Sequence, residues 1–162
     1  MAESPPELEP LDDKEEPAEL SPEEARQQEA ARWFEQAESD LTAAHDNVAS
    51  GHFNWACYMA EQAAEKAVKA VYVFRDLPFR RIHTILDLIL GNAARRVEGV
   101  HELSHLQEAA DGLDAVMTSS RYPDAVPFAA VPARHFSESQ AEECIEWAQQ
   151  IVNAVRDLSP NI

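Results

Sequence analysis

A group of basic side chains near the middle of the sequence has the chemistry of a site for a small anion. Its members are Lys66, Lys69, Arg75, Arg80, Arg81 and His83. The two lysines are three residues apart, so they share one face if the segment is helical. A helix starting at His83 would add unpaired N–H groups and the positive end of its dipole. The pattern predicts a phosphate site for GTP or ATP, whose base could stack on Tyr72 or Phe79.

The same group also has a purely structural interpretation. Its cations could be solvated and balance the carboxylates of Glu61, Glu65 and Asp76. Glu65 and Lys69 are four residues apart in the favourable order for an ion pair on a solvated helix face. His83 would then be a helix-capping or core-edge residue. Both interpretations stay open, and neither requires a cofactor, a metal site or a catalytic residue.

The loop at residues 120–128 (SRYPDAVPF) could either hold the fold together or bind a ligand. The residues of a candidate structural clasp are Arg121, Tyr122, Pro123 and Asp124. In this clasp the proline fixes the backbone, the guanidinium pairs with the aspartate and the tyrosine packs against a helix. The chain beyond it is expected to cross the bundle in an extended path, with Phe128 and Val131 as plugs. In the alternative, Arg121 holds an anion at the mouth of a dimer cleft.

Length and composition favour one domain that does not contact a membrane. A chain of 162 residues suffices for one domain with a modest core. No apolar run reaches the roughly 20 residues that span a bilayer. The first residues lack the basic start and apolar core of a signal peptide, so we expect a cytoplasmic protein. Cys57 and Cys144 lie in apolar helical patterns, where we expect buried, reduced thiols.

The negative charge of the chain is concentrated at its beginning. Residues 1–24 contain ten Asp or Glu and one Lys, a charge of −9 out of the total of −17. Residues 1–20 also have few large apolar side chains, so we expect a disordered acidic tail. The remaining charge of −8 has the wrong sign for a surface that collects phosphates broadly. Broad DNA or RNA binding is therefore not expected.

From residue 21 onward, apolar residues recur at the three- and four-residue steps of helices. Ser21 and Ser137 have the composition of helix caps, and Gly51 and Gly91 are helix stops. The expected helices cover residues 21–49, 53–74, 83–90, about 100–117, and 137–158. No strand-like alternation is present. The sequence predicts an all-α, up-and-down bundle of about five helices over residues 21–160.

Four segments resemble the HEPN family in their order and spacing. They are residues 33–41 (WFEQAESDL), 53–70 (FNWACYMAEQAAEKAVKA), 83–88 (HTILDL) and 120–124 (SRYPD). The continuation of the last segment through residues 125–132 (AVPFAAVP) to residues 134–137 (RHFS) is most similar to the sacsin branch of the family. The resemblance covers roughly residues 25–158.

The resemblance implies a helical bundle that usually dimerises. HEPN proteins divide into ribonucleases and non-catalytic members that bind nucleotides or act as interaction modules. The sacsin branch is of the second kind and is linked to chaperone function. The resemblance therefore implies a non-catalytic, homodimeric module for a nucleotide or for a protein partner of the chaperone type.

A metal-independent ribonuclease is the alternative within the family. Its pattern is an arginine followed after four to six residues by a histidine, which supply a phosphate-holding cation and a proton-transfer group. Arg95 or Arg96 with His101 fits this spacing. Val97 or Arg96 replaces the polar residue that the pattern usually has directly after the arginine, and the pair precedes the fourth helix rather than the last. A third possibility is a dimeric scaffold without a ligand.

Apolar side chains beyond the main stripes suggest where a dimer would form. Trp55, Tyr58 and Met59 lie partly outside the stripe of the second helix, and Trp147 lies at the edge of the last. Such a surplus is either additional core or an interface. The implied homodimerisation favours the interface.

Overall fold

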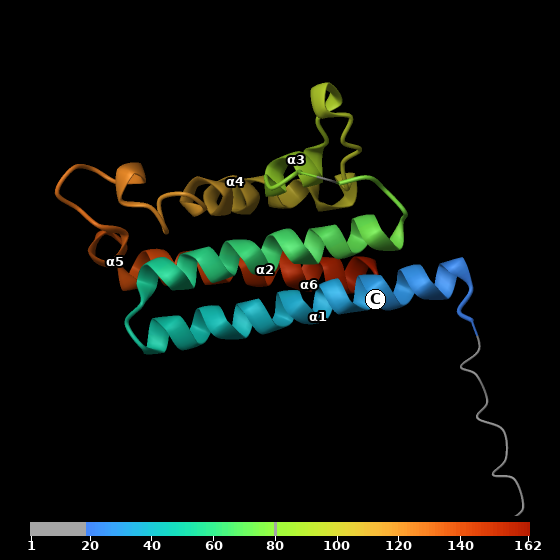
Figure 1. Ribbon diagram of the computed structural model, residues 1–162, viewed down its shortest axis with the longest axis horizontal. Helices are drawn as coiled ribbons and strands as arrows, with labels where there is room; N and C mark the ends of the chain where they lie inside the picture. Colours follow the sequence, from blue (N-terminus) through green and yellow to red (C-terminus); the bar gives the residue numbers. More distant parts are fainter. Residues whose placement is uncertain (1–18, 80) are drawn as a thin grey trace, which may run out of the picture.

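The computed structural model describes residues 19–79 and 81–162 (Figure 1). Within these residues the α-helices are α1 (Pro22–Ala49), α2 (Phe53–Phe74), α3 (Ile85–Leu90), α4 (Gln107–Val116), α5 (Pro132–His135) and α6 (Glu138–Leu158). Short 3-10 helices are η1 (Ala93–Arg95), η2 (His101–Leu106) and η3 (Pro123–Ala125). No strand forms in this part of the chain, and an isolated bridge joins Asn92 to Val97. The predicted all-α fold is confirmed.

The described helices differ from the five expected ones in two places. Pro132 starts a single helical turn, α5, in a segment that we expected to be extended. The expected fourth helix is divided into η2 and α4. The predicted acidic tail, residues 1–20, lies outside the described residues except for Glu19 and Leu20, which are exposed.

The helices α1 and α2 form the predicted antiparallel hairpin. Ser21 and Glu24 form a reciprocal capping box at the start of α1, so the acidic first turn faces the positive end of the helix dipole. The turn after α1 passes through Gly51, whose φ of +75° is a left-handed conformation that glycine adopts without strain. A second capping box, of Ser137 and Gln140, starts α6 as expected.

The central element of the molecule is α2. It packs against α1 and α6 along its length, while α3, α4 and α5 contact it from other sides (Figure 1). Small residues such as Ala60, Ala64 and Ala67 are completely buried and let the neighbouring helices approach closely. Cys57 and Cys144 are buried free thiols, as predicted, and the contact with Cys57 together with burial raises the pKa of Cys144. Among the described helices, none combines the length and the hydrophobicity that a bilayer crossing requires.

A polar stripe on α2 faces the layer formed by α3, η2 and α4. Its members are Asn54, Glu61, Glu65, Lys69 and Tyr72, all of them buried. The Asn54 amide donates to the Ser120 carbonyl at 3.0 Å, and the Tyr72 hydroxyl donates to the Leu88 carbonyl at 2.7 Å. Buried polar groups need such partners, so the stripe fixes how the second layer sits on α2.

The start of α3 is held by a side chain of α4. The Asp114 carboxylate accepts hydrogen bonds from the backbone N–H groups of Ile85, at 2.8 Å, and Leu86, at 2.9 Å. Burial raises the pKa of Asp114 to about 6, against the opposing effect of these two bonds. The expectation that this helix starts at His83 with free N–H groups is wrong, because it starts at Ile85 and Asp114 occupies them.

A glycine in α4 makes room for a tryptophan of α6. A Cβ atom added at Gly112 would lie 2.4 to 2.9 Å from three atoms of the Trp147 ring. Trp147 is half-buried and packs against the core. The close approach of α4 and α6 therefore requires a glycine at position 112. Trp147, which we considered as an interface residue, packs within the monomer.

We expect Gly112→Ala to destabilise the protein although alanine favours a helix. The gain in helix propensity is about 1 kcal/mol, whereas overpacking costs typically 1–3 kcal/mol, so a net loss of about 1 kcal/mol should lower Tm by about 2–4 °C. Thermal unfolding followed by circular dichroism measures the change. In a Trp147→Leu background the same substitution should be neutral or stabilising. An equal loss in both backgrounds would contradict the packing explanation.

A second prediction concerns Glu61, whose Oε1 atom is buried without a hydrogen-bond partner in the described residues. Burial raises the pKa of Glu61 from 4.5 to about 8, and the neighbouring Glu65 and Asp114 carboxylates add to the rise. The folded state therefore binds a proton that the unfolded state releases, and stability falls as pH rises from about 4.5 to 8.

The isosteric, neutral variant Glu61→Gln removes this loss. Relative to the wild type it should gain on the order of 2 kcal/mol of stability between pH 5 and pH 8. Urea unfolding at several pH values measures the difference. The variant Glu35→Gln, on an exposed part of α1, is the control and should follow the wild type. Parallel pH profiles for wild type and Glu61→Gln would show that Glu61 is not the titrating group.

Candidate functional site

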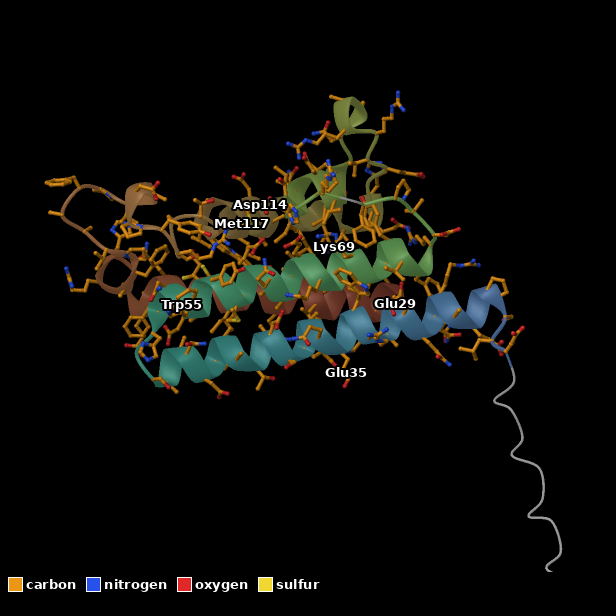
Figure 2. All side chains as sticks on the ribbon, viewed as in Figure 1. Glu29, Glu35, Trp55, Lys69, Asp114 and Met117 are labelled. Carbon is orange, nitrogen blue, oxygen red and sulfur yellow. The ribbon has the colours of Figure 1, made fainter. Side chains whose placement is uncertain are left out.

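One cavity brings together four of the predicted anion-binding residues. Its volume is about 460 Å³. The lining residues are Trp33 of α1, Tyr58, Gln62, Glu65, Lys66 and Lys69 of α2, His83 before α3, and Met117 and Arg121 after α4. We call it the Arg121 cavity. Figure 2 shows Lys69 on the side of α2 that faces Asp114 and Met117 of the second layer.

Lys69 is the most buried cation of the cavity. Its side chain is 8% exposed and forms an ion pair with the equally buried Glu65. The ammonium lies 6.0 Å from the centre of the Trp33 ring and 5.6 Å from that of Phe79, within reach of both π faces. The expectation that Glu65 and Lys69 form a pair on a solvated face is therefore wrong. Lys69 is part of the cavity floor.

Glu65 also connects Lys69 with His83. The Nδ1 atom of His83 lies 3.2 Å from the Glu65 Oε1 atom, and Gln62 donates to Oε2 at 3.1 Å. The His83 side chain is 66% exposed, so its ring stands at the cavity edge. The buried Glu65 carboxylate thus contacts two basic groups, Lys69 and His83, and the side-chain amide of Gln62.

Lys66 lies nearer to solvent than Lys69. Its Nζ atom is 2.6 Å from the Asp40 Oδ2 atom and 3.1 Å from the Gln62 Oε1 atom. The side chain is 25% exposed. A lysine ammonium has three donors, so these two contacts leave one donor for a ligand.

Arg121 is held in place without a carboxylate. Its Nε atom donates to the Met117 carbonyl at 2.9 Å, and the guanidinium lies over the rings of Tyr58, at 4.8 Å, and Tyr122, at 4.9 Å. Among the described residues, no acceptor bonds to its terminal nitrogens. A planar guanidinium with free terminal donors can bind a phosphate or carboxylate through two bonds.

The loop differs from the predicted clasp in its internal contacts. Arg121 stacks on Tyr122 instead of pairing with Asp124, and both Tyr122 and Asp124 are exposed. Phe128 is fully exposed, so its expected role as a plug is wrong. The buried apolar residue of this loop is Val126, whose side chain is 8% exposed.

The remaining predicted residues lie away from the cavity. Arg75 forms an ion pair with Glu102, with nitrogen–oxygen distances of 2.8 and 3.3 Å. Arg81 is exposed and does not line the cavity. Arg80 lies outside the described residues. Phe79 contacts the Lys69 ammonium from outside the cavity, and Tyr72 is fully buried with its hydroxyl bonded.

The alternative ribonuclease residues are not gathered in one cavity. Arg95 and Arg96 are exposed and line a hollow of about 450 Å³ that does not include His101. The guanidinium of Arg95 lies 3.7 Å from Asp87. His101 is exposed at the start of η2. Within the described residues, no group of three or more His, Cys, Asp or Glu is placed to hold a metal ion.

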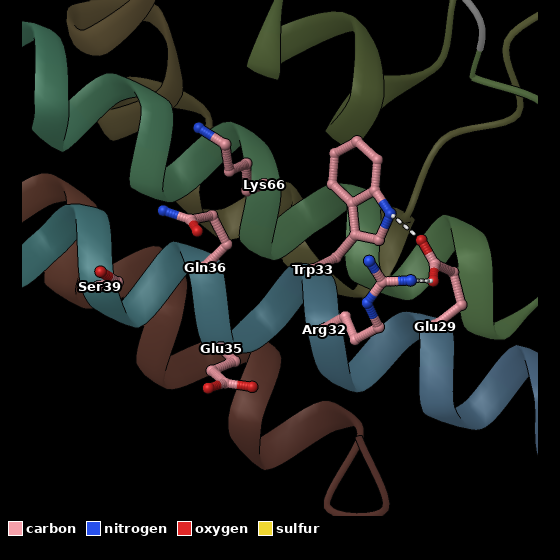
Figure 3. A pocket seen from close by; sticks show the side chains of 7 residues that line it. All are labelled: Glu29, Arg32, Trp33, Glu35, Gln36, Ser39 and Lys66. Carbon is pink, nitrogen blue, oxygen red and sulfur yellow. Dashed lines mark hydrogen bonds and ion pairs between the residues drawn. The ribbon is translucent and has the colours of Figure 1, made fainter.

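Sequence reasoning missed the contribution of α1 to the site. Trp33 lines both the Arg121 cavity and a neighbouring hollow of about 560 Å³ along α1 (Figure 3). The other residues of this hollow are Glu29, Arg32, Glu35, Gln36, Ser39 and Lys66. Trp33 donates to Glu29 at 3.2 Å, which orients the indole. Trp33 falls on the apolar periodicity of residues 30–48, which by itself predicts a core position, and a tryptophan at the edge of such a stripe is the signal that could have marked it.

Comparison with known proteins gives one family and several relatives. The HEPN domain model matches residues 30–158. The crystal structure of TT1696 from Thermus thermophilus is 39% identical and superposes with a TM-score of 0.69, covering 79% of this chain and 96% of that one.

Two curated proteins are more distant. The candidate toxin MJ1304 of Methanocaldococcus jannaschii is 25% identical over 133 residues, which are 79% of this chain and 86% of that protein. Human sacsin is 28% identical over 126 residues, which are 76% of this chain but only 3% of sacsin. Because the family match extends from α1 to the end of α6, the chain belongs to the HEPN domain family.

Proposed function

We propose that this HEPN domain is a non-catalytic, homodimeric module that binds a nucleotide in the Arg121 cavity. The observation that carries the proposal is the state of Arg121. Its guanidinium is fixed by a carbonyl and two rings, while its terminal donors have no acceptor in the described residues. Because this guanidinium is already held in place and has free donors, an anion can bind it with little further loss of side-chain entropy.

The charges around the cavity favour a small phosphate-bearing ligand. Glu65 is paired with Lys69 and Lys66 with Asp40, so those pairs contribute little net charge. Arg121 then gives the site a positive charge within an acidic chain. Trp33 and Tyr58 offer ring faces for a base, in place of Tyr72 and Phe79. A GTP or ATP molecule combines these two requirements.

The alternatives have weaker support. A ribonuclease would agree with the name of MJ1304 as a candidate toxin, but the arginine and histidine of the expected pattern do not share a cavity. A chaperone-type protein partner would agree with the likeness to sacsin, of which this chain spans 3%. A scaffold without a ligand would leave the free donors of Arg121 without a role.

Homodimerisation rests on Trp55 and its surroundings. Trp55 is 44% exposed and packs edge-on against Tyr58, with ring centres 6.0 Å apart. Tyr58 in turn supports Arg121. A dimer that covers Trp55 would therefore lie next to the cavity. Met59 packs against the core, so it contributes less to such an interface than expected.

Nucleotide binding is tested by thermal shift with GTP and ATP, with and without magnesium. We expect Tm to rise with ligand concentration, because a ligand that binds the native state at 100 times its Kd stabilises it by about 2.7 kcal/mol. The rise should be lost in Arg121→Ala and reduced in Lys66→Ala.

The matched control is Arg156→Ala. Arg156 also lies over an aromatic ring, that of Phe34 at 5.6 Å, but on α6 and away from the cavity. This variant should keep the full ligand-induced rise. An unchanged rise in Arg121→Ala, or no rise with either nucleotide, would refute the proposed site. Metal-independent RNA cleavage that is lost in His101→Ala would favour the ribonuclease instead.

Dimerisation is tested by light scattering after size-exclusion chromatography. The wild type should have twice the mass of the chain at micromolar concentration, and Trp55→Ser should shift it to the monomer. Leu90→Ser is the control, because Leu90 is also an exposed apolar residue, at 37%, but belongs to α3. A wild type that stays monomeric, or equal effects of the two substitutions, would contradict the proposed interface.

A further inference from the structure

Two hollows adjoin at the end of the molecule where α1 begins. The first, of about 340 Å³, is lined by Ala25, Arg26, Glu29, Tyr72, Val73, Asp76, Leu77 and Phe79. The second, of about 450 Å³, is lined by Leu77, Pro78, Phe79, Ile82, Arg95, Arg96 and Val97. Leu77 and Phe79 line both, so the two hollows form a continuous surface, which we call the arginine groove. Figure 1 shows that α1 starts beside the end of α2 that leads into it.

The arginine groove has an apolar floor and a basic rim. Leu77, Phe79 and Ile82 provide apolar surface along the floor. Arg26 and Arg96 have no carboxylate partner within the described residues, and Arg95 has only Asp87 at 3.7 Å. Glu29 and Asp76 also line the first hollow, so the excess of positive charge is greatest around Arg95 and Arg96. This combination fits an acidic peptide that carries apolar side chains.

The chain contains such a peptide eight residues before α1. Residues 7–13 (ELEPLDD) have leucines at Leu8 and Leu11 between four carboxylates. Pro10 favours a polyproline II backbone for this segment, in which three residues per turn bring Leu8 and Leu11 to the same side. The eight residues between this segment and Pro22 can span roughly 30 Å when extended, and Ala25 and Arg26, which line the first hollow, lie within about one helical turn of Pro22.

We propose that residues 7–13 dock in the arginine groove of the same chain, with the two leucines on the apolar floor and the carboxylates against Arg95 and Arg96. Two features favour this occupant over a separate acidic protein. The segment is tethered beside the groove, so its effective concentration is in the millimolar range. Its charge also complements the rim within a chain whose total charge is strongly negative.

A second groove with an apolar lining does not fit this segment. It lies between α1 and α6, has a volume of about 570 Å³ and includes Val48 and Ile145 in its lining. Glu142 and Glu146 also line it, and they would repel an acidic peptide. Charge therefore distinguishes the two apolar surfaces.

The test uses the full chain with a nitroxide spin label on Ser4→Cys. Cys57 and Cys144 are 0% and 2% exposed, so the label reacts selectively at the new cysteine. Paramagnetic broadening of backbone amides is measured by NMR in a dilute sample. We expect broadening at Leu77, Ile82 and Val97, and none at Gly51 at the opposite end of the hairpin. Mixing with excess unlabelled protein should leave it unchanged, since the contact is within one chain.

Matched variants distinguish the proposed contact from general charge attraction. Arg95→Gln/Arg96→Gln and Leu8→Ser/Leu11→Ser should each abolish the broadening. Arg134→Gln/Arg156→Gln removes the same charge elsewhere and should preserve it, as should Glu15→Gln/Glu16→Gln. Broadening that is absent, that appears at the α1 and α6 groove or that survives both groove and leucine variants would overturn the proposal. Broadening that is diluted out by unlabelled protein would show contact between chains and overturn it as well.

Discussion

The buried carboxylate of Glu65 is the interaction on which the site depends. It accepts from Gln62, pairs with Lys69 and lies beside His83, so one side chain links the core of α2 to the segment that precedes α3. A lysine as buried as Lys69 is tolerated only with such a partner, and the partner in turn must be covered by the second layer. Glu65 and Lys69 therefore form the floor of the Arg121 cavity and connect it to the segment before α3.

The regular part of the fold was predictable because it follows from local chemistry. The capping boxes at Ser21 and Ser137 and the apolar periodicity determine where α1 and α6 begin and which faces they bury. The burial of Glu61 and Glu65 was not predictable in this way. A Glu–Lys spacing of four is the same on a solvated face and in an interior, and periodicity does not show how many helices surround α2. The division of η2 from α4 depends on packing that no local signal describes.

The sequence predicted which types of residue form the candidate site better than it predicted how they are arranged. Lys66, Lys69 and His83 were expected to converge on an anion, and Arg121 was a separate candidate from a distant loop. All four line one cavity. The composition of that loop, with Arg121, Asp124 and two prolines, supplied the reason to consider it. The spacing of residues in the sequence does not show that Arg75 forms an ion pair with Glu102. It also does not show that the guanidinium of Arg121 stacks on Tyr58 and Tyr122 instead of pairing with Asp124.

The contact between Asp114 and the start of α3 also determines the order in which parts of the molecule can form. A helix of six residues does not persist alone in water, and here its first two N–H groups are satisfied by a residue of α4. The helix α3 therefore depends on α4 being docked, and the two elements should open and close cooperatively as one local unfolding unit. Since His83 lies two residues before α3, its position at the cavity edge depends on that unit being closed.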